Sequence, residues 1–465
     1  MITYLKKLLS TSLFYYCCAS AVNLPQLAPA GYNGMTPYEE KVAGQQFYAY
    51  MQARGNLVYD PLALDYINHL GFKLIAASNR PQQHFLFFIV KDSQINAFAG
   101  PGGYIGVNTG LILFAKTEGE LAAVLAHEIA HVTQRHIAQS IEAANRGKIP
   151  ATAAAIAGLL IGVPAISMGA IGASAQSQLN FTRAQEQDAD HEGTKTLQRA
   201  GFDPNDMATM FDHMQRASYS NSSDQFEFLS THPANKNRIA RAQHQTSVMS
   251  TTKKHVSSLH FYLIQTHLSV ELSGDPQKVL LFFEKNLKKN PHNLIYQYGY
   301  ALALARNHHT KTALHAMQTV AAQDPDEIYF TLSLADLQND SGNTQDALKI
   351  LSEQIKFYPD YFPLTLQYAT TLIKANQSKQ AALFLKKHYR EYDDNLLFLD
   401  LYQEALGKSG DMAGCYEARA KIYGLFYQPK MAIGQLELAQ ELPNLDKYQK
   451  ASLEAQIREL NKQTK

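Results

Sequence analysis

The spacing of hydrophobic positions changes near residue 250. Before that point, short apolar runs typical of strands alternate with helical patterns, and these runs lie at 84–91, 95–98 and 104–114. After it, apolar side chains recur at the three-to-four-residue spacing of helices. The pattern therefore predicts an α+β first part, mainly helical with a small sheet, followed by an all-α second part.

The second part repeats itself every 34 residues. Prolines that end helical runs keep this period, and so do two series of small side chains: Pro291, Pro325 and Pro359; Ala301, Ala335 and Ala369; and Ala313, Ala347, Ala381 and Cys415. Small residues are needed where two helices cross closely, and a 34-residue helix pair resembles the tetratricopeptide repeat (TPR). An irregular helical domain is the alternative, but three series in one register argue against it. We expect a solenoid of four to six TPR units.

A helix is predicted to begin near residue 117. Gly and Pro at 99–103 mark a turn, and the apolar run that follows gives way to "KTEGELAAVLAHEIAHVTQRH". Thr117 followed by Glu120 is a capping box, a typical helix start. Apolar residues surround the histidines of this segment, so we expect the helix to be buried.

The same helix carries the pattern H-E-x-x-H at His127, Glu128 and His131. Side chains at i and i+4 lie one above the other, so both imidazoles can converge on one metal ion. Glu128 lies beside them, where it can take a proton from water held at the metal. A chance match on a surface helix is the alternative. A polar cluster on a buried helix needs partners, however, and a metal would supply them.

His136 lies nine residues after His127. At about 100° per residue a continuous helix would point it to the opposite face, so we predict that it is not a metal ligand. We expect it on the surface or between domains instead.

A third ligand is expected from the helical segment 180–193. Glu186 and Asp190 share one face at i and i+4. Glu186 would complete a site of two histidines and one glutamate, and Asp190 would accept the second ring N–H of a ligand histidine. The alternative is a solvated acidic face, which we expect for Asp188 and Glu192. Spacing alone leaves the assignment open.

The N-terminus has the pattern of a secretory signal peptide. Lys6 and Lys7 precede a charge-free apolar run and small residues, which predicts cleavage after Ala21; an uncleaved anchor is the alternative. We therefore expect a signal peptide at 1–21, a catalytic domain at 22–250, a TPR domain at 251–465, and a periplasmic location. The net charge of +1 provides no global basic field, so we expect no nucleic-acid partner.

A charge-free stretch runs from residue 149 to 180. It is rich in Ala and Gly, and Gly162, Pro164 and Gly169 divide it into short pieces. We expect a pair of helices that covers the metal site or makes peripheral contact with a membrane surface. A single crossing would leave Glu186 unable to reach His127.

Three motifs in order resemble the zinc metallopeptidase family that includes the CAAX prenyl endopeptidases. They are "NAFAGPGGYIGVNTGL", "AHEIAHVTQRH" and "FTRAQEQDAD". The resemblance implies a zincin-type domain with one Zn²⁺ per chain, held by His127, His131 and Glu186, and Glu128 as the general base. An exported catalytic domain followed by TPR repeats resembles periplasmic members of this family. These act, with chaperone-like activity, on unfolded or stalled outer-membrane proteins alongside the barrel assembly machinery.

Two further segments bear on substrate binding. The strand at 104–112 is expected at the edge of the cleft, where Tyr104, Ile105 and Val107 would pair with an extended substrate; a core strand is the alternative. The segment with His232 and Arg238 resembles the family's His-Pro…Arg segment. His232 would donate to an oxyanion or occupy the open zinc position, with a solvated loop as the alternative. Arg238 is expected at the substrate site.

The preferred hypothesis is a zinc endopeptidase with a TPR recognition domain. A second hypothesis is a TPR-based chaperone or binding module whose proteolysis is latent. A third is a structural protein that zinc only stabilises. Glu128 favours an enzyme over the structural hypothesis, because a structural site has no use for a base.

Overall fold

A computed structural model describes residues 35–140, 183–220, 225–232, 236–247, 249, 256–443 and 445–463. The predicted cleavage after Ala21 and the charge-free stretch 149–180 lie outside these residues. Among the helices of the described part, none is long and apolar enough to cross a membrane.

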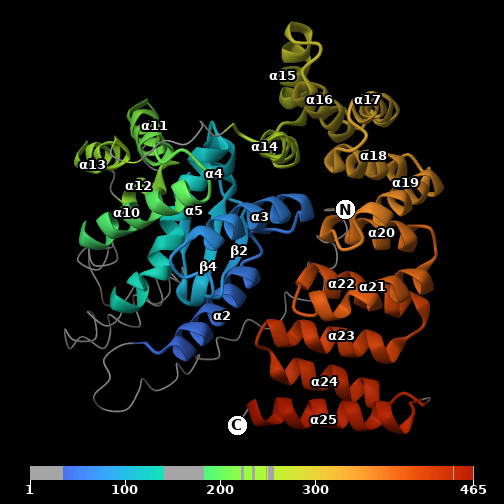
Figure 1. Cartoon of the computed structure of the whole chain (residues 1–465). Coiled ribbons are helices and arrows are strands. Elements are labelled where there is room, and N and C mark those ends of the chain that lie inside the picture. The colour runs from blue at the N-terminus through green and yellow to red at the C-terminus, as the bar shows by residue number, and fades with distance from the viewer. Residues whose placement is uncertain are drawn as a thin grey trace, which may run out of the picture.

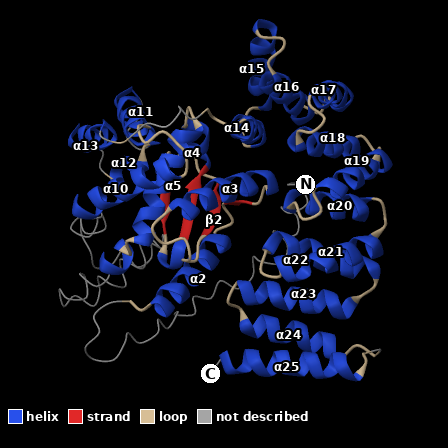
Figure 2. Ribbon diagram, viewed as in Figure 1, coloured by secondary structure: helices blue, strands red, loops and turns tan. Residues whose placement is uncertain are grey.

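The first part of the chain contains one small mixed sheet. Its strands are β1 (Leu57–Val58), β2 (Leu86–Val90), β3 (Ala97–Ala99) and β4 (Tyr104–Asn108), in the order β1-β2-β4-β3. β2 and β4 are parallel, with Leu86 opposite Tyr104, and the two outer pairs are antiparallel. Figure 2 shows the strands enclosed by helices.

Helices cover this sheet. In chain order they are α2 (Pro37–Ala53), α3 (Pro61–Ala77), the short η1 (Pro101–Gly103), α4 (Thr109–Phe114), α5 (Glu118–Thr133), α10 (Arg183–Arg199), α11 (Asp206–Ser220), α12 (Glu227–Thr231) and α13 (Lys236–Ser247). α5 is buried over its whole length, because it packs on β3 and α3 on one side and on α10 and α11 on the other. The central position of α5 makes it the element that positions the site.

The predicted strand run 104–114 is wrong in its second half, because 109–114 form helix α4. The turn is fixed by Asp92, whose carbonyl accepts from the Thr109 hydroxyl and from the Gly110 N–H. Leu111 and Ile112 then enter the core from a helix. A short buried apolar run fits a strand and a helix equally well, and only the tertiary bonds decide between them.

The second part consists of paired helices, as the repeat predicts. They are α14 (Leu259–Glu271), α15 (Pro276–Lys289), α16 (Leu294–Arg306), α17 (Thr310–Gln323), α18 (Ile328–Asp340), α19 (Thr344–Phe357), α20 (Phe362–Lys374), α21 (Ser378–Tyr392), α22 (Leu396–Ser409), α23 (Met412–Leu425), α24 (Pro429–Gln440) and α25 (Lys447–Gln463). Figure 1 shows them stacked in a column from α15 to α25.

The 34-residue period is the period of the helices themselves. α16, α18, α20 and α22 begin at 294, 328, 362 and 396. The alanines of both predicted series are fully buried, and Cys415 is buried with them. The α+β fold followed by an all-α TPR solenoid is therefore confirmed.

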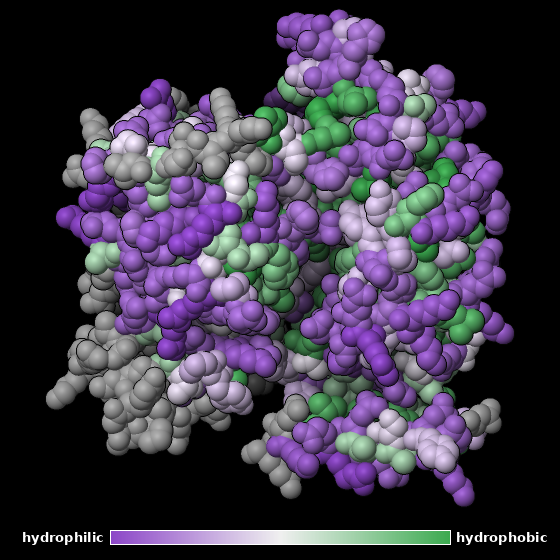
Figure 3. All heavy atoms as spheres, in the orientation of Figure 1, coloured by the Kyte–Doolittle hydropathy of each residue, from purple (hydrophilic) through white to green (hydrophobic). Residues whose placement is uncertain are grey.

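The two parts are joined by direct contacts. α14 packs on α3 and α4, where the Gln265 amide donates to the carbonyls of Ile112 and Ala115. The Tyr361 hydroxyl donates to Asp65 of α3 at 3.0 Å. Buried apolar side chains of the sheet and of the first repeats form one continuous cluster. In Figure 3 a recess runs between the two parts, with hydrophobic atoms beside it.

Candidate metal centre

Helix α5 starts as the sequence predicts. The Thr117 hydroxyl accepts from the Glu120 N–H at 3.1 Å. The Glu120 carboxylate accepts from the N–H of Lys116, one residue before the cap, rather than from Thr117 itself. From this start the helix places His127 and His131 on one buried face.

Four side chains converge at this face. His127, His131, Glu186 and His232 are all buried, and one nitrogen or oxygen of each lies within 4.8 Å of the others. His127 Nε2 lies 3.0 Å from His131 Nε2, and Glu186 oxygens lie 3.6 Å and 3.5 Å from these two nitrogens. His232 Nδ1 lies 3.3 Å from His127 Nε2 and 2.8 Å from Glu186 Oε1.

These distances fit ligands of one metal ion. Ligand atoms about 2.0–2.1 Å from a tetrahedral ion lie about 3.3–3.4 Å from one another. Burial lowers the pKa of His131 well below its usual range, so the ring is neutral and has a lone pair to offer. Within the described residues, both oxygens of buried Glu128 lack a hydrogen-bond partner. Buried polar atoms without partners are rare, so this carboxylate has the capacity to bond a water molecule or a substrate at the cluster.

The carboxylate predicted to accept from His127 lies beside its ring. Its Nδ1 lies 3.1 Å from Asp190 Oδ1, one turn beyond Glu186 on α10. Burial raises the pKa of Asp190, but the bonds from His127 and Arg238 outweigh burial and hold this pKa below its usual range. Asp190 therefore stays ionised, and a proton on His127 Nδ1, facing this carboxylate, would leave Nε2 with the lone pair that a metal needs.

Arg238 does not lie at a substrate-binding surface, and that prediction is wrong. Its side chain is 2% exposed and makes two bonds of 2.7 Å to the Asp190 carboxylate. It also lies 2.7 Å from Glu186 Oε2 and donates to the carbonyl of His232. Arg238 thus holds the carboxylates of Glu186 and Asp190 in place. It also supplies the positive charge that a buried pair of acidic side chains needs.

Glu128 faces the same centre from α5. Its carboxylate is fully buried, and Oε1 lies 3.6 Å from His232 Nε2. Burial raises the pKa of Glu128, although His232 and His127 oppose this effect. A carboxylate with a raised pKa beside a group of candidate metal ligands can accept and return a proton.

His232 is not a solvated loop residue. Its ring is buried, with Nδ1 in the cluster and Nε2 toward Glu128. Burial lowers its pKa, but the charges of Glu186 and Glu128 outweigh burial, so the pKa is raised. Of the two predicted roles, this geometry favours occupation of the fourth metal position.

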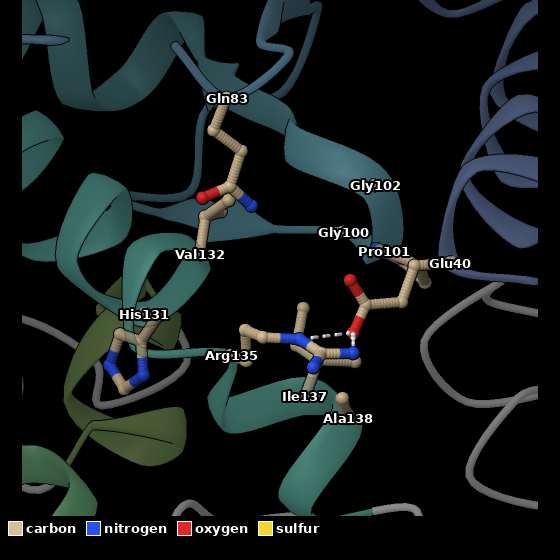
Figure 4. Close-up of a pocket in the computed structure, with 10 residues that line it drawn as sticks. All are labelled: Glu40, Gln83, Gly100, Pro101, Gly102, His131, Val132, Arg135, Ile137 and Ala138. Atoms are coloured by element: carbon tan, nitrogen blue, oxygen red, sulfur yellow. Dashed lines mark hydrogen bonds and ion pairs between the residues drawn. The ribbon is translucent and has the colours of Figure 1, made fainter. Parts of the chain in front are cut away.

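The predicted position of His136 is wrong. The prediction assumed one continuous helix, but α5 ends at Thr133, and Arg135 has a left-handed φ of 58°. This turn brings His136 back to the site, where it is 2% exposed and its Nδ1 lies 3.0 Å from His131 Nδ1. Figure 4 shows Arg135 held to Glu40 across a small pocket that His131 also lines.

The predicted substrate strand is also wrong. β4 pairs with β2 on one side and with β3 on the other, so it is not an edge strand. Tyr104, Ile105 and Val107 are buried. They belong to the core, which was the alternative, and β3 is the outer strand on the side of α5.

Comparisons with known proteins found peptidase relatives of this chain. A family model described as Peptidase family M48 matches residues 61–246. The chain is 31% identical to the putative beta-barrel assembly-enhancing protease of Vibrio cholerae serotype O1, over 94% of this chain and 92% of that protein. It is 29% identical to the beta-barrel assembly-enhancing protease of Escherichia coli (strain K12), over 95% and 92%.

Among solved structures, a thermophilic TPR protein of Thermus thermophilus is 20% identical, with a TM-score of 0.25, over 42% of this chain and 97% of that one. The sequence matches confirm the predicted resemblance to a metallopeptidase family.

Proposed function

The chain belongs to peptidase family M48 and is a metallopeptidase, and from this premise we propose that it is a periplasmic zinc endopeptidase of outer-membrane protein assembly. The observation that carries the proposal is the convergence of His127, His131 and Glu186 beside Glu128, whose carboxylate has no hydrogen-bond partner among the described residues. Two imidazoles and one carboxylate are the ligand set of several catalytic zinc sites.

In this proposal His127, His131 and Glu186 would hold one Zn²⁺. When bound, the ion would supply a Lewis acid that polarises the attacking water and the substrate carbonyl. Glu128 takes a proton from the water as the water oxygen bonds to the carbonyl carbon, and it returns this proton to the amide nitrogen as the C–N bond breaks. Asp190 and Arg238 keep the ligands oriented, because their bonds leave His127 and Glu186 one usable arrangement each.

We propose that an extended substrate pairs with β3. Within the described residues no strand lies on the outer side of Ala97–Ala99, and β3 packs beside α5. Main-chain hydrogen bonds to such an edge bind many sequences, which suits a protease of unfolded chains.

His232 is proposed to keep the enzyme latent. Its Nδ1 lies close to two proposed ligands, and its Nε2 faces Glu128, so the ring fills the space that substrate needs. This arrangement also favours the second candidate function, a TPR-based chaperone whose proteolysis is rarely used.

The setting of the reaction is part of the proposal. The relatives from Vibrio cholerae and Escherichia coli are named for β-barrel assembly, and the signal-peptide pattern supports export with cleavage after Ala21. We propose a catalytic domain at 22–250, a TPR domain at 251–465, and peripheral membrane contact through 149–180. Unfolded or stalled outer-membrane proteins are the proposed substrates, and the barrel assembly machinery is the proposed partner.

Cleavage of a urea-denatured outer-membrane β-barrel protein by the purified chain tests the proposal. We expect cleavage that stops with 1,10-phenanthroline and returns with one equivalent of zinc, while the folded barrel stays intact. A denatured soluble protein of the same length controls for substrate class. Cleavage that survives metal removal would contradict the zinc site; binding of the denatured barrel without cleavage, by a zinc-loaded chain, would favour the chaperone.

A further inference from the structure

His136 and Asp188 form a chain of bonds that ends on buried His131. His136 Nδ1 lies 3.0 Å from His131 Nδ1, and His136 Nε2 lies 3.3 Å from Asp188 Oδ2. Asp188 lies on α10 between Glu186 and Asp190, and its side chain is 48% exposed. Neither residue belongs to the proposed ligand set.

The direction of one hydrogen bond decides whether His131 can bind a metal. If His136 donated to His131 Nδ1, the proton of His131 would lie on Nε2, which points at the cluster. If His131 donates instead, its Nε2 keeps a lone pair for the metal. His136 must then accept at Nδ1 and carry its own proton on Nε2.

Asp188 selects the second arrangement. A carboxylate only accepts, so its contact with His136 Nε2 places the proton of a neutral His136 on that nitrogen. His136 Nδ1 is then a lone pair, and His131 Nδ1 must donate to it. In this arrangement Asp190 would set the tautomer of His127 directly, whereas Asp188 would set the tautomer of His131 through the ring of His136.

The backbone conformation at Arg135 brings His136 into contact with His131. Arg135 takes a left-handed conformation that is uncommon for a residue with a side chain, and such conformations persist only where the surroundings hold them. Its guanidinium donates to the carbonyl of Met35 at 2.6 Å and to Glu40 at 2.8 Å. These bonds to α2 and the segment before it hold the turn that returns His136 to the site.

We propose that His136 is a positioning residue, which with Asp188 fixes the tautomer of His131 that binds zinc. The inference rests on the proposed zinc site and goes beyond it. It gives His136, which lies outside the H-E-x-x-H motif, a role in zinc binding. It predicts that zinc affinity falls when His136 no longer accepts the hydrogen bond from His131.

Zinc affinity of the full chain, measured by competition with a fluorescent zinc chelator, tests the inference. We expect His136→Ala to weaken zinc binding by about 10–100-fold, the usual effect of losing a partner of a ligand histidine. Asn places its side-chain amide near the position of Nδ1, and Gln places it near that of Nε2. His136→Asn should therefore restore affinity to within a few-fold, while His136→Gln should resemble Ala.

Two variants separate positioning from folding. Asp188→Ala removes a half-exposed side chain, so it should lower zinc affinity without changing the melting temperature of the metal-free chain. His191→Ala removes an exposed histidine from the same helix and should change neither. If His136→Ala fails to fold, the Asn, Gln and Asp188 variants still decide.

Equal zinc affinity in the wild type, His136→Ala and Asp188→Ala would overturn the inference, and so would equal loss in the Ala, Asn and Gln variants. Wild-type protein that binds no zinc would instead contradict the proposed zinc site itself. The two failures are therefore distinguishable.

Discussion

We expect Asp60→Asn to lower the free energy of unfolding at pH 6 and to leave it nearly unchanged at pH 10. Asp60 caps α3 by accepting from the Ala63 N–H, and its other oxygen lies 2.8 Å from His267 Nε2 of α14. Both side chains are almost buried. Asn retains the cap and removes the charge, so the variant isolates the bond that joins the first TPR helix to α3.

The expected loss in the free energy of unfolding follows from the pKa of His267. Burial lowers this pKa, but the charge of Asp60 outweighs burial and raises it to about 9, from an ordinary value of 6.5. A raised pKa in the folded state stabilises the protein fully below pH 6.5 and loses this effect as the pH rises through 9. Proton linkage between these two pKa values gives about 3 kcal/mol at pH 6, about 1.4 kcal/mol at pH 8 and almost nothing at pH 10.

Urea unfolding followed by circular dichroism measures this difference. Wild type and variant are compared at pH 6, 8 and 10, with metal removed so that its own pH dependence does not contribute. Asp275→Asn is the matched control, because Asp275 caps α15 in the same way but is exposed. Its effect should be small and the same at each pH. A loss for Asp60→Asn that is equal at pH 6 and pH 10 would refute the reasoning.

Three further predictions concern the site and the contact between the two parts. His232→Ala should raise the rate of casein hydrolysis, since the ring would no longer block the cluster; a fall in rate would support the oxyanion role instead. Arg238→Met should lower the free energy of unfolding by about 3–5 kcal/mol in urea, because Asp190 is left buried without its cation; a change below about 1 kcal/mol would contradict this. Tyr361→Phe should lower the same free energy by about 1–3 kcal/mol, because Asp65 loses its donor; an unchanged urea midpoint would show that water replaces the hydroxyl.

The repeat array was predictable because its signal is local and repeated. Each helix pair needs small side chains where its helices cross, so Ala301, Ala335 and Ala369 recur at the period of the fold. Helix α5, which carries His127 and His131, was predictable because its signal is also local. Two histidines at i and i+4 lie on one face of any α-helix, and Thr117 fixes where this helix starts.

The errors arose where one segment depends on another. β4 is interior because β3 returns to pair with it, and no pattern within 104–114 records that pairing. Arg238 is predicted at the substrate site, but in the fold its side chain lies against two carboxylates of the distant helix α10, Glu186 and Asp190, and donates to the nearby carbonyl of His232. The spacing of Glu186 and Asp190 permitted a metal site without requiring one, and only the folded arrangement brings Glu186 to the histidines.

His136 shows how one residue can reverse a geometric prediction. The face of a helix is predictable only as far as the helix continues, and here it ends three residues before His136. The sequence held a weak signal of this end, because polar residues Thr133, Gln134 and Arg135 follow the apolar run. That signal indicates a helix end but not a left-handed turn.

The most direct test of the account is made on one preparation of Glu128→Gln, in which zinc content and cleavage of a denatured outer-membrane protein are measured together. Gln keeps the shape of the side chain but cannot accept a proton as a carboxylate does, and Glu128 is not among the proposed ligands. We predict one zinc per chain, as in the wild type, and no cleavage above background. Full cleavage by zinc-loaded Glu128→Gln would contradict the account.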